Sequence, residues 1–395
     1  MKLPKNSTLL SLLVLSALSA GALHGAEPTS ADINELKAKL EELTEKIQKL
    51  EKTGKKIDAL PTVTIGSDGL NVKSDDGKFS AAIHAVIQAD SRNFFDKTQA
   101  GANQGFLLRR ARPILEGKVY DNIDFQIVPD FGGTSVQLFD AWVNLTIFPE
   151  LQIKVGKFKT PFGLEQLQAD SDLAFNERSL ATDLVPNRDL GVDIHGNIAG
   201  RLINYDLALL NGVGDARNSG NFDFDGSKEV VGRLFFEPFS KTKVSALDHL
   251  GFGVAGTVGH ATTAASLPGT TGGTLPGYTT DGQQQAFAYN PVSGTVSANG
   301  NRWRVSPQLF YTYGPFSLLG EYVVSGQKLQ KGAVSQNVQN SAWNISIGYV
   351  LTGEEATFKK LTPANPVDFT SGHWGAWQLV ARVSQLDLDD KIFPS

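Results

Sequence analysis

The sequence predicts an all-β protein, a transmembrane antiparallel β-barrel preceded by an N-terminal helix that forms a coiled coil. Short segments of alternating apolar and polar residues recur from residue 78 onward, as in half-buried β-strands. No segment after residue 26 approaches the run of about 20 apolar residues that a membrane helix needs. A chain without such a helix can cross a membrane only as a closed barrel.

Composition supports short strands and turns and excludes several classes of site. The 395 residues include 40 glycines, 23 phenylalanines, one methionine and no cysteine. Without thiols, disulfides, thiolate catalysis and the usual cysteine-type zinc sites are excluded. A net charge of −5 argues against a nucleic-acid partner. The mean hydropathy of −0.15 is compatible with a membrane barrel, because lipid-facing and water-facing residues alternate along each strand.

The first 26 residues have the form of a secretory signal peptide. Lys2 and Lys5 precede a short apolar run, Leu9 to Leu18, and small residues follow it. Cleavage after Ala22 or after Ala26 fits this pattern.

Residues 31–56 predict a helix with one apolar seam. The seam positions follow one another in steps of three and four, flanked by Glu and Lys: Ile33, Leu36, Leu40, Leu43, Ile47 and Leu50. A single helix of this length is marginal in water, which favours a self-associating coiled coil in the periplasm over a helix packed on its own domain. Residues 57–77, marked by Pro61, Gly66 and Gly69, are expected to form a linker before a barrel domain at 78–395.

About thirteen alternating segments are expected in the barrel domain. They are Phe79–Asp90, Gly105–Val119, Phe125–Asp130, Val136–Ile147, Leu151–Thr160, Leu190–Ile198, Leu202–Leu210, Val230–Phe236, Leu250–Gly259, Arg302–Tyr313, Phe316–Gln327, Ala342–Leu351 and Trp374–Leu386. Tight turns and long polar connections alternate between these segments, which is typical of outer-membrane barrels. Phe131–Ser135, which is short, and Thr352–Gly372, which is long, break this alternation.

Four stretches resemble the phosphate-selective porins of the O and P type. They are GFLLRRARPILEGKVYDNIDFQIVPDFG, GKFKTPFGLEQL, ERSLATDLVPNRDLGV and GAWQLVARVSQLDL, within residues 78–388. The resemblance implies an outer-membrane homotrimer, about sixteen strands per barrel, and a third long loop, Pro161–Asp189, folded inward. Because about three strands would then be lacking after Trp374–Leu386, we expect an open seam between that segment and the first strand.

Alternation assigns a charged interior. In Gly105–Val119 the outward set Leu115, Gly117 and Val119 turns Arg110 and Arg112 inward and leaves Arg109 on the other face. The expected anion path is Arg110, Arg112, Lys154, Lys157, Lys159, Arg233, Arg304 and Arg382, with Arg110 and Arg112 matching the family's arginine ladder. The expected constriction residues are Asp140, which could balance a lysine, and Glu177, Arg178 and Arg188. These arginines could instead only neutralise facing carboxylates.

The predicted function is passive diffusion of small anions, phosphate or polyphosphate first, across an outer membrane. The alternatives are a weakly selective general porin and a periplasmic tether that acts through the helix. An enzyme is not expected, because no Ser and His spacing suggests a hydrolase. Neither a cofactor nor a metal is expected, since His84 and His195 stand apart without paired carboxylates in sequence.

Overall fold

The computed structural model describes residues 30–393 except 59, 67–68, 96–103, 134, 224, 243–244, 263–274, 276 and 290–295. The predicted signal peptide, residues 1–26, lies outside these described residues. The chain divides into two compact units, Met1–Pro61 and Thr62–Ser395.

The described residues of the first unit form the helix α2 (Ser30–Asp58), which covers the segment with the heptad seam. Ion pairs within the helix, Lys39 to Glu35 and Lys46 to Glu42, join side chains four residues apart at 2.7 and 2.6 Å. The seam leucines Leu40, Leu43 and Leu50 are 63%, 58% and 70% exposed. Their exposure within one chain leaves the apolar seam available to a partner helix, so self-association stays a prediction.

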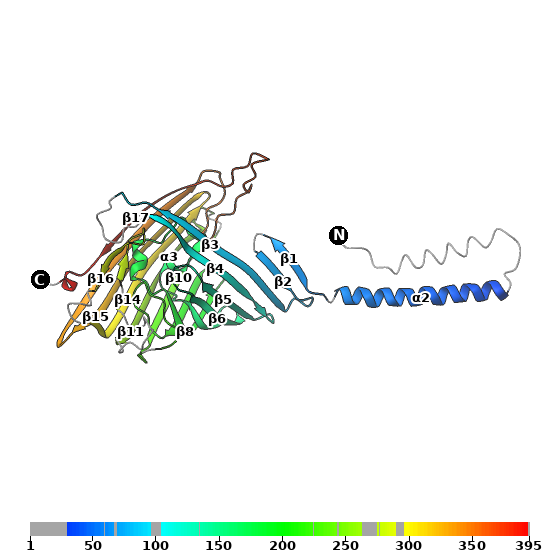
Figure 1. Cartoon of the computed structure of the whole chain (residues 1–395), viewed down its shortest axis with the longest axis horizontal. Coiled ribbons are helices and arrows are strands. Elements are labelled where there is room, and N and C mark those ends of the chain that lie inside the picture. Colours follow the sequence, from blue (N-terminus) through cyan, green and yellow to red (C-terminus); the bar gives the residue numbers. More distant parts are fainter. Residues whose placement is uncertain are drawn as a thin grey trace. The chain divides into compact units, whose positions relative to one another are not determined.

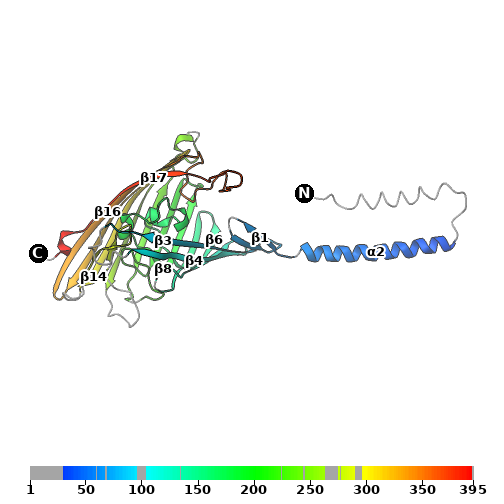
Figure 2. The same ribbon diagram turned by 45° about the horizontal axis from the view of Figure 1, so that its top comes forward.

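The second unit is built on one antiparallel sheet of fifteen strands, each paired with its neighbours in the chain (Figures 1 and 2). Its strands are β1 (Thr62–Gly66), β2 (Gly69–Lys73), β3 (Phe79–Arg92), β4 (Gly105–Val119), β5 (Ile123–Asp130), β6 (Gln137–Phe148), β7 (Leu151–Lys159), β8 (Arg188–Ile198), β9 (Ile203–Leu210), β10 (Glu229–Phe236), β11 (His249–Thr262), β14 (Val296–Tyr313), β15 (Phe316–Lys331), β16 (Val334–Val350) and β17 (Gln378–Asp387). A small hairpin, β12 (Gly277–Thr279) with β13 (Gln285–Ala288), lies between β11 and β14.

The thirteen strands from β3 to β17 in this sheet overlap the thirteen predicted segments. The expected linker at 57–77 is wrong in part, because β1 and β2 form a hairpin that pairs with β3. Alternating Val63, Ile65, Leu70 and Val72 supply the strand pattern that the glycines of the turn obscured. In the described part of the chain β1 and β17 are the edge strands of the sheet. The seam was expected beside β3, but β2 pairs with that edge of β3.

The outer face of the sheet is apolar and exposed, and its inner face is polar and buried, which is the reverse of a soluble protein. In β10 the outer residues Val230 and Leu234 are 44% and 45% exposed, whereas Glu229 and Arg233 on the inner face are 2% and 8% exposed. The same exposed apolar band continues on the outer faces of β7 to β9, β11, β16 and β17. An exposed apolar band around a polar interior is the pattern of a membrane β-barrel. None of the described helices is long and apolar enough to span a bilayer.

Most of the short connections lie at one end of the barrel, although the two-residue turn between β15 and β16 lies at the other. β4–β5, β6–β7, β8–β9 and β14–β15 are joined by tight turns at the first of these ends, which we call the short-turn end. The opposite, long-loop end carries the connection between β7 and β8, residues 160–187, which we call the constriction loop. It contains α3 (Leu164–Leu167) and the short helices η2 (Asp170–Asp172) and η3 (Leu180–Leu184).

A candidate channel constriction

The constriction loop crosses the interior of the barrel. It leaves the sheet at β7, yet η3 contacts β15, β16 and β17, and α3 contacts β15, so the loop reaches the strands across from its own (Figure 2). Phe162, Leu184 and Val185 of the loop are almost fully buried and pack in one apolar cluster with wall residues such as Val231 and Val323. Burial of three large apolar side chains, each worth roughly 1.5 to 3 kcal/mol, holds the loop inside the barrel.

Polar contacts with the wall fix the position of α3. Glu321 of β15 accepts a hydrogen bond from the backbone N–H of Leu164, and Gln308 of β14 donates to the carbonyl of Phe162. A Cβ at Gly163 would lie 2.6 Å from Cγ1 of Val185, so only glycine fits where the loop turns against its own core.

Asp170 collects three guanidinium groups. Arg178 Nη1 and Arg110 Nε lie 2.6 and 3.3 Å from its Oδ1, and Arg112 binds its Oδ2. Burial alone would raise the pKa of Asp170, but Arg178, Arg112, Lys159 and Arg110 hold it well below its usual range. Asp170 thus joins the constriction loop to the inner face of β4.

Glu177 is the second anchor of the loop on β4. Its carboxylate lies 2.5 Å from Arg109 Nε and 3.2 Å from Arg110 Nη2. The prediction that Arg109 faces outward is therefore wrong. The register between β3 and β4 shifts after Gln88, which pairs with Arg110 while Ala89 pairs with Leu108, so Arg109 is an extra bulged residue whose side chain is re-aimed.

The constriction residue Asp140 pairs with Arg188 rather than with a lysine, which corrects the expectation: Arg188 Nε lies 3.1 Å from Asp140 Oδ2. The lysines bind backbone oxygens instead. Lys157 Nζ lies 2.7 Å from the carbonyl of Ser219, and Lys159 Nζ lies 2.5 Å from the carbonyl of Gln168. Both ammonium groups therefore fasten loops.

The three arginines predicted on later strands also have acidic partners. Arg233 lies 3.5 Å from Asp206. Arg304 lies 2.6 Å from both Asp215 and Glu229. Arg382 lies 2.5 Å from Asp281 and 3.4 Å from Glu165. The side chain of Arg304 is 0% exposed, which encloses its charge in the wall. Lys154 differs, since its Nζ lies over the rings of Trp142 and Phe158, 5.3 and 5.6 Å from their centroids.

A second segment enters the barrel from the short-turn end, and sequence reasoning missed its charged residues. Residues 354–362, between β16 and β17, form this inward segment. Gln168 Nε2 of the constriction loop donates to the carbonyl of Phe358 at 2.7 Å, and the ring of Phe358 stacks edge-on against Phe310 of β14 at 4.9 Å. The available signal was the connection Thr352–Gly372, which was too long for the end at which it lies.

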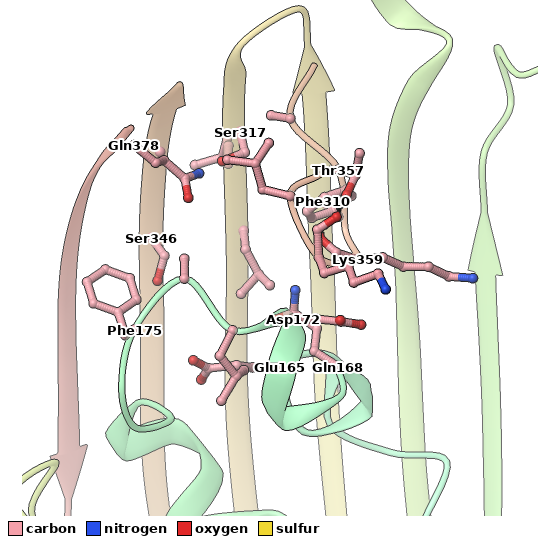
Figure 3. Close-up of a pocket in the computed structure, with 18 of the residues that line it drawn as sticks. Glu165, Gln168, Asp172, Phe175, Phe310, Ser317, Ser346, Thr357, Lys359 and Gln378 are labelled. Atoms are coloured by element: carbon pink, nitrogen blue, oxygen red, sulfur yellow. Dashed lines mark hydrogen bonds between the residues drawn. The ribbon is translucent and has the colours of Figure 1, made fainter. Parts of the chain in front are cut away.

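Three cavities surround the meeting point of the two segments. The first, about 800 Å³, follows β2 to β8, the second, about 1120 Å³, follows β8 to β14, and the third, about 250 Å³, lies against β14 to β17. Lys359 and Lys360 line all three. Figure 3 shows the third cavity above α3, with Lys359 and Asp172 on its lining.

Cations exceed carboxylates around the first cavity. Its basic lining residues are Arg112, Lys154, Lys159, Arg188, Lys359 and Lys360, against Glu116, Asp140, Asp170 and Asp172. Lys359 forms no ion pair within the described residues, in contrast to the arginines of the wall. Lys359 of the inward segment and Lys154 of β7 are thus basic residues of this cavity that form no ion pair in the described structure.

Acidification is expected to stabilise the constriction loop through Asp183. Burial, followed by repulsion from Asp281 and Asp215, raises the pKa of Asp183 from 3.8 to about 7. Because the folded state binds this proton more tightly than the unfolded state, the penalty for its charge is present at pH 8 and disappears as the pH falls below 7. Thermal unfolding at pH 8 and pH 5 should show a gain on the order of 2 kcal/mol at pH 5.

The matched variant for this prediction is Asp183→Asn, which cannot ionise. It should be more stable than the parent chain at pH 8, and its gain in stability between pH 8 and pH 5 should be smaller than that of the parent by about 2 kcal/mol. An equal pH dependence in both proteins would contradict the assignment.

The wide antiparallel sheet, its apolar outer band and its charged interior crossed by a loop define an outer-membrane porin. The chain belongs to the phosphate-selective porin O and P family, which matches residues 82–393. Porin O of Pseudomonas aeruginosa is 25% identical over 354 residues, covering 82% of this chain and 76% of that protein. Membership of this family indicates a channel of the Gram-negative outer membrane.

Two solved porins have lower similarity. OmpT of Vibrio cholerae aligns with a TM-score of 0.41 and 10% identity, over 69% of this chain and 71% of its own. An anion-selective porin from Comamonas acidovorans aligns with a TM-score of 0.42 and 10% identity, over 69% and 75%. At these scores neither bears on the solute of this chain.

Proposed function

We propose that this protein is an anion-selective pore for small solutes, phosphate or polyphosphate first. The observation that carries the proposal is that Lys359 and Lys360 line three cavities around the constriction loop. A solute that moves through any of these three cavities therefore passes these two lysines. Positive charge at the narrowest region lowers the energy of an anion there and raises that of a cation.

The predicted arginine ladder has a different part in this proposal. Arg110, Arg112 and Arg178 hold the constriction loop through Asp170, and Arg304 is closed inside the wall. Lys154 and Lys359, which form no ion pair in the described structure, would make transient contact with an anion. Such a path offers several weak sites, which an ion can leave as readily as it enters.

Planar bilayer recordings of the purified full-length protein test the proposal. In a KCl gradient the reversal potential should have the sign of chloride selectivity, and millimolar phosphate should reduce the chloride current as the two anions compete. A reversal potential of the opposite sign would refute anion selectivity.

The extensive ion pairing of the interior favours a second candidate, a weakly selective general porin. Every arginine predicted on the path has at least one carboxylate within 4.0 Å in the described structure, which leaves few cations to discriminate between solutes. In this case the reversal potential would be near zero and phosphate would leave the current unchanged, so the same recordings separate the two.

The helix α2 is proposed to assemble three chains into a homotrimer on the periplasmic side. The exposed seam leucines Leu40, Leu43 and Leu50 support this role, because burial against partner helices would remove apolar surface from water. Light scattering should give a trimer mass for the purified protein. Deletion of residues 31–56 should leave the conductance equal to that of the parent chain if the protein is a pore. A tether that acts through the helix would lose its role in the same variant.

A further inference from the structure

A group of metal-binding side chains lies on the wall, outside the constriction. Asp193 and His195 are two residues apart on β8, so their side chains point to the same face, and Asp206 of β9 pairs directly opposite His195. One ligand atom from each of the three side chains lies within 4.8 Å of the others. Sequence spacing did not indicate this site, because pairing with the neighbouring strand supplies the third ligand.

One oxygen of the buried Asp193 carboxylate lacks a hydrogen-bond partner in the described structure. Asp193 is 2% exposed, and the oxygen without a partner is its Oδ1. Lys154 pairs opposite it in the β7–β8 register, but the Lys154 ammonium lies over aromatic rings and forms no ion pair in the described residues. A buried carboxylate oxygen without a partner is costly, and a bound cation would satisfy it.

His195 is held in an orientation suited to binding a metal. Its Nε2 lies 2.9 Å from Asn144 Oδ1, which accepts the ring N–H and leaves Nδ1 of the neutral ring as a ligand. Asp206 is held by Arg233, whose Nη1 lies 3.5 Å from Oδ2. Metal-binding histidines usually have such a partner on the second ring nitrogen.

We propose that Asp193, His195 and Asp206 bind a divalent transition-metal ion of the zinc type. Two carboxylate oxygens and one imidazole nitrogen form a three-ligand set that zinc accepts, with a fourth position open to water or an anion. His195 and Asp206 are partly exposed, so an ion can reach the site from the barrel interior. The site is separate from Lys359 and Lys360, and its existence does not depend on anion selectivity.

The test is calorimetric titration of ZnCl₂ into the folded full-length protein in detergent. Saturable binding of one zinc ion per chain is expected, with affinity at least about tenfold weaker in His195→Ala and in Asp193→Asn. His84→Ala is the matched control, because His84 has only one acidic neighbour within 4.0 Å, Glu116 at 3.9 Å, in the described residues. It should bind zinc as the parent chain does.

Absence of saturable binding would overturn the proposal, as would binding unchanged in both variants of the cluster. Heat modifiability on SDS gels verifies that each variant is folded. Should a variant fail to fold, Co²⁺ added to the parent chain gives a second measurement: visible absorption that zinc displaces supports the site, and its absence overturns it. Conductance is not read in either experiment, so failure here is distinct from failure of the proposed pore.

Discussion

Reversing both charges of the inward segment, in Lys359→Glu with Lys360→Glu, should lower the ratio of anion to cation permeability at least about tenfold. The two lysines line all three of these cavities, so the change alters the charge in each of them. A unit charge about 4 Å from a permeating ion changes its energy by about 1 kcal/mol even in bulk water. The measurement is the reversal potential in a salt gradient, at low and at high ionic strength.

The control for this prediction reverses two lysines that line none of the three cavities, Lys241→Glu with Lys331→Glu. Both are exposed, and the net charge changes by the same amount. This control should keep the selectivity of the parent chain. Equal loss of selectivity in the two double variants would assign the effect to the overall field of the protein, and unchanged selectivity in Lys359→Glu with Lys360→Glu would remove the inward segment from the path.

Removal of the charge at Asp170 should release the constriction loop. In Asp170→Asn the guanidinium groups of Arg110, Arg112 and Arg178 lose their shared carboxylate in a buried site. Breaking a buried ion pair from one side costs about 3 to 5 kcal/mol. We expect trypsin to cut the folded variant after Arg178 at a rate at least about tenfold above that of the parent chain, and single-channel currents to become larger and noisier.

Asp172→Asn is the control, since it removes the same charge two residues away where no ion pair lies within 4.0 Å in the described structure. Its loop should resist trypsin as the parent loop does. Equal protection of Asp170→Asn would show that the apolar cluster around Phe162 and Leu184 holds the loop without the arginines.

Strand positions were predictable because each strand has one face toward lipid and one toward the interior. The alternation of Val230 and Leu234 with Glu229 and Arg233 is visible in the sequence and reappears as exposure and burial. The same rule failed at Arg109, where one bulged residue changes which side the next side chain takes.

Partners of the interior charges were not predictable, because they come from distant parts of the chain. Asp170 meets Arg110 across 60 residues, and Gln168 meets Phe358 across 190. The inward direction of the Arg304 side chain can be predicted from the alternation along its strand, but its enclosure by Asp215 and Glu229 cannot. The zinc-type cluster depends in the same way on the pairing of β8 with β9.

The sequence by itself determined the class of fold, the inward direction of most charged side chains and the family, because these depend on local periodicity and on contiguous motifs. The tertiary structure alone decided which of those charges are neutralised. Whether a cation is enclosed, fastens a loop or faces the cavities depends on carboxylates brought to it by strand register and by two loops entering from opposite ends.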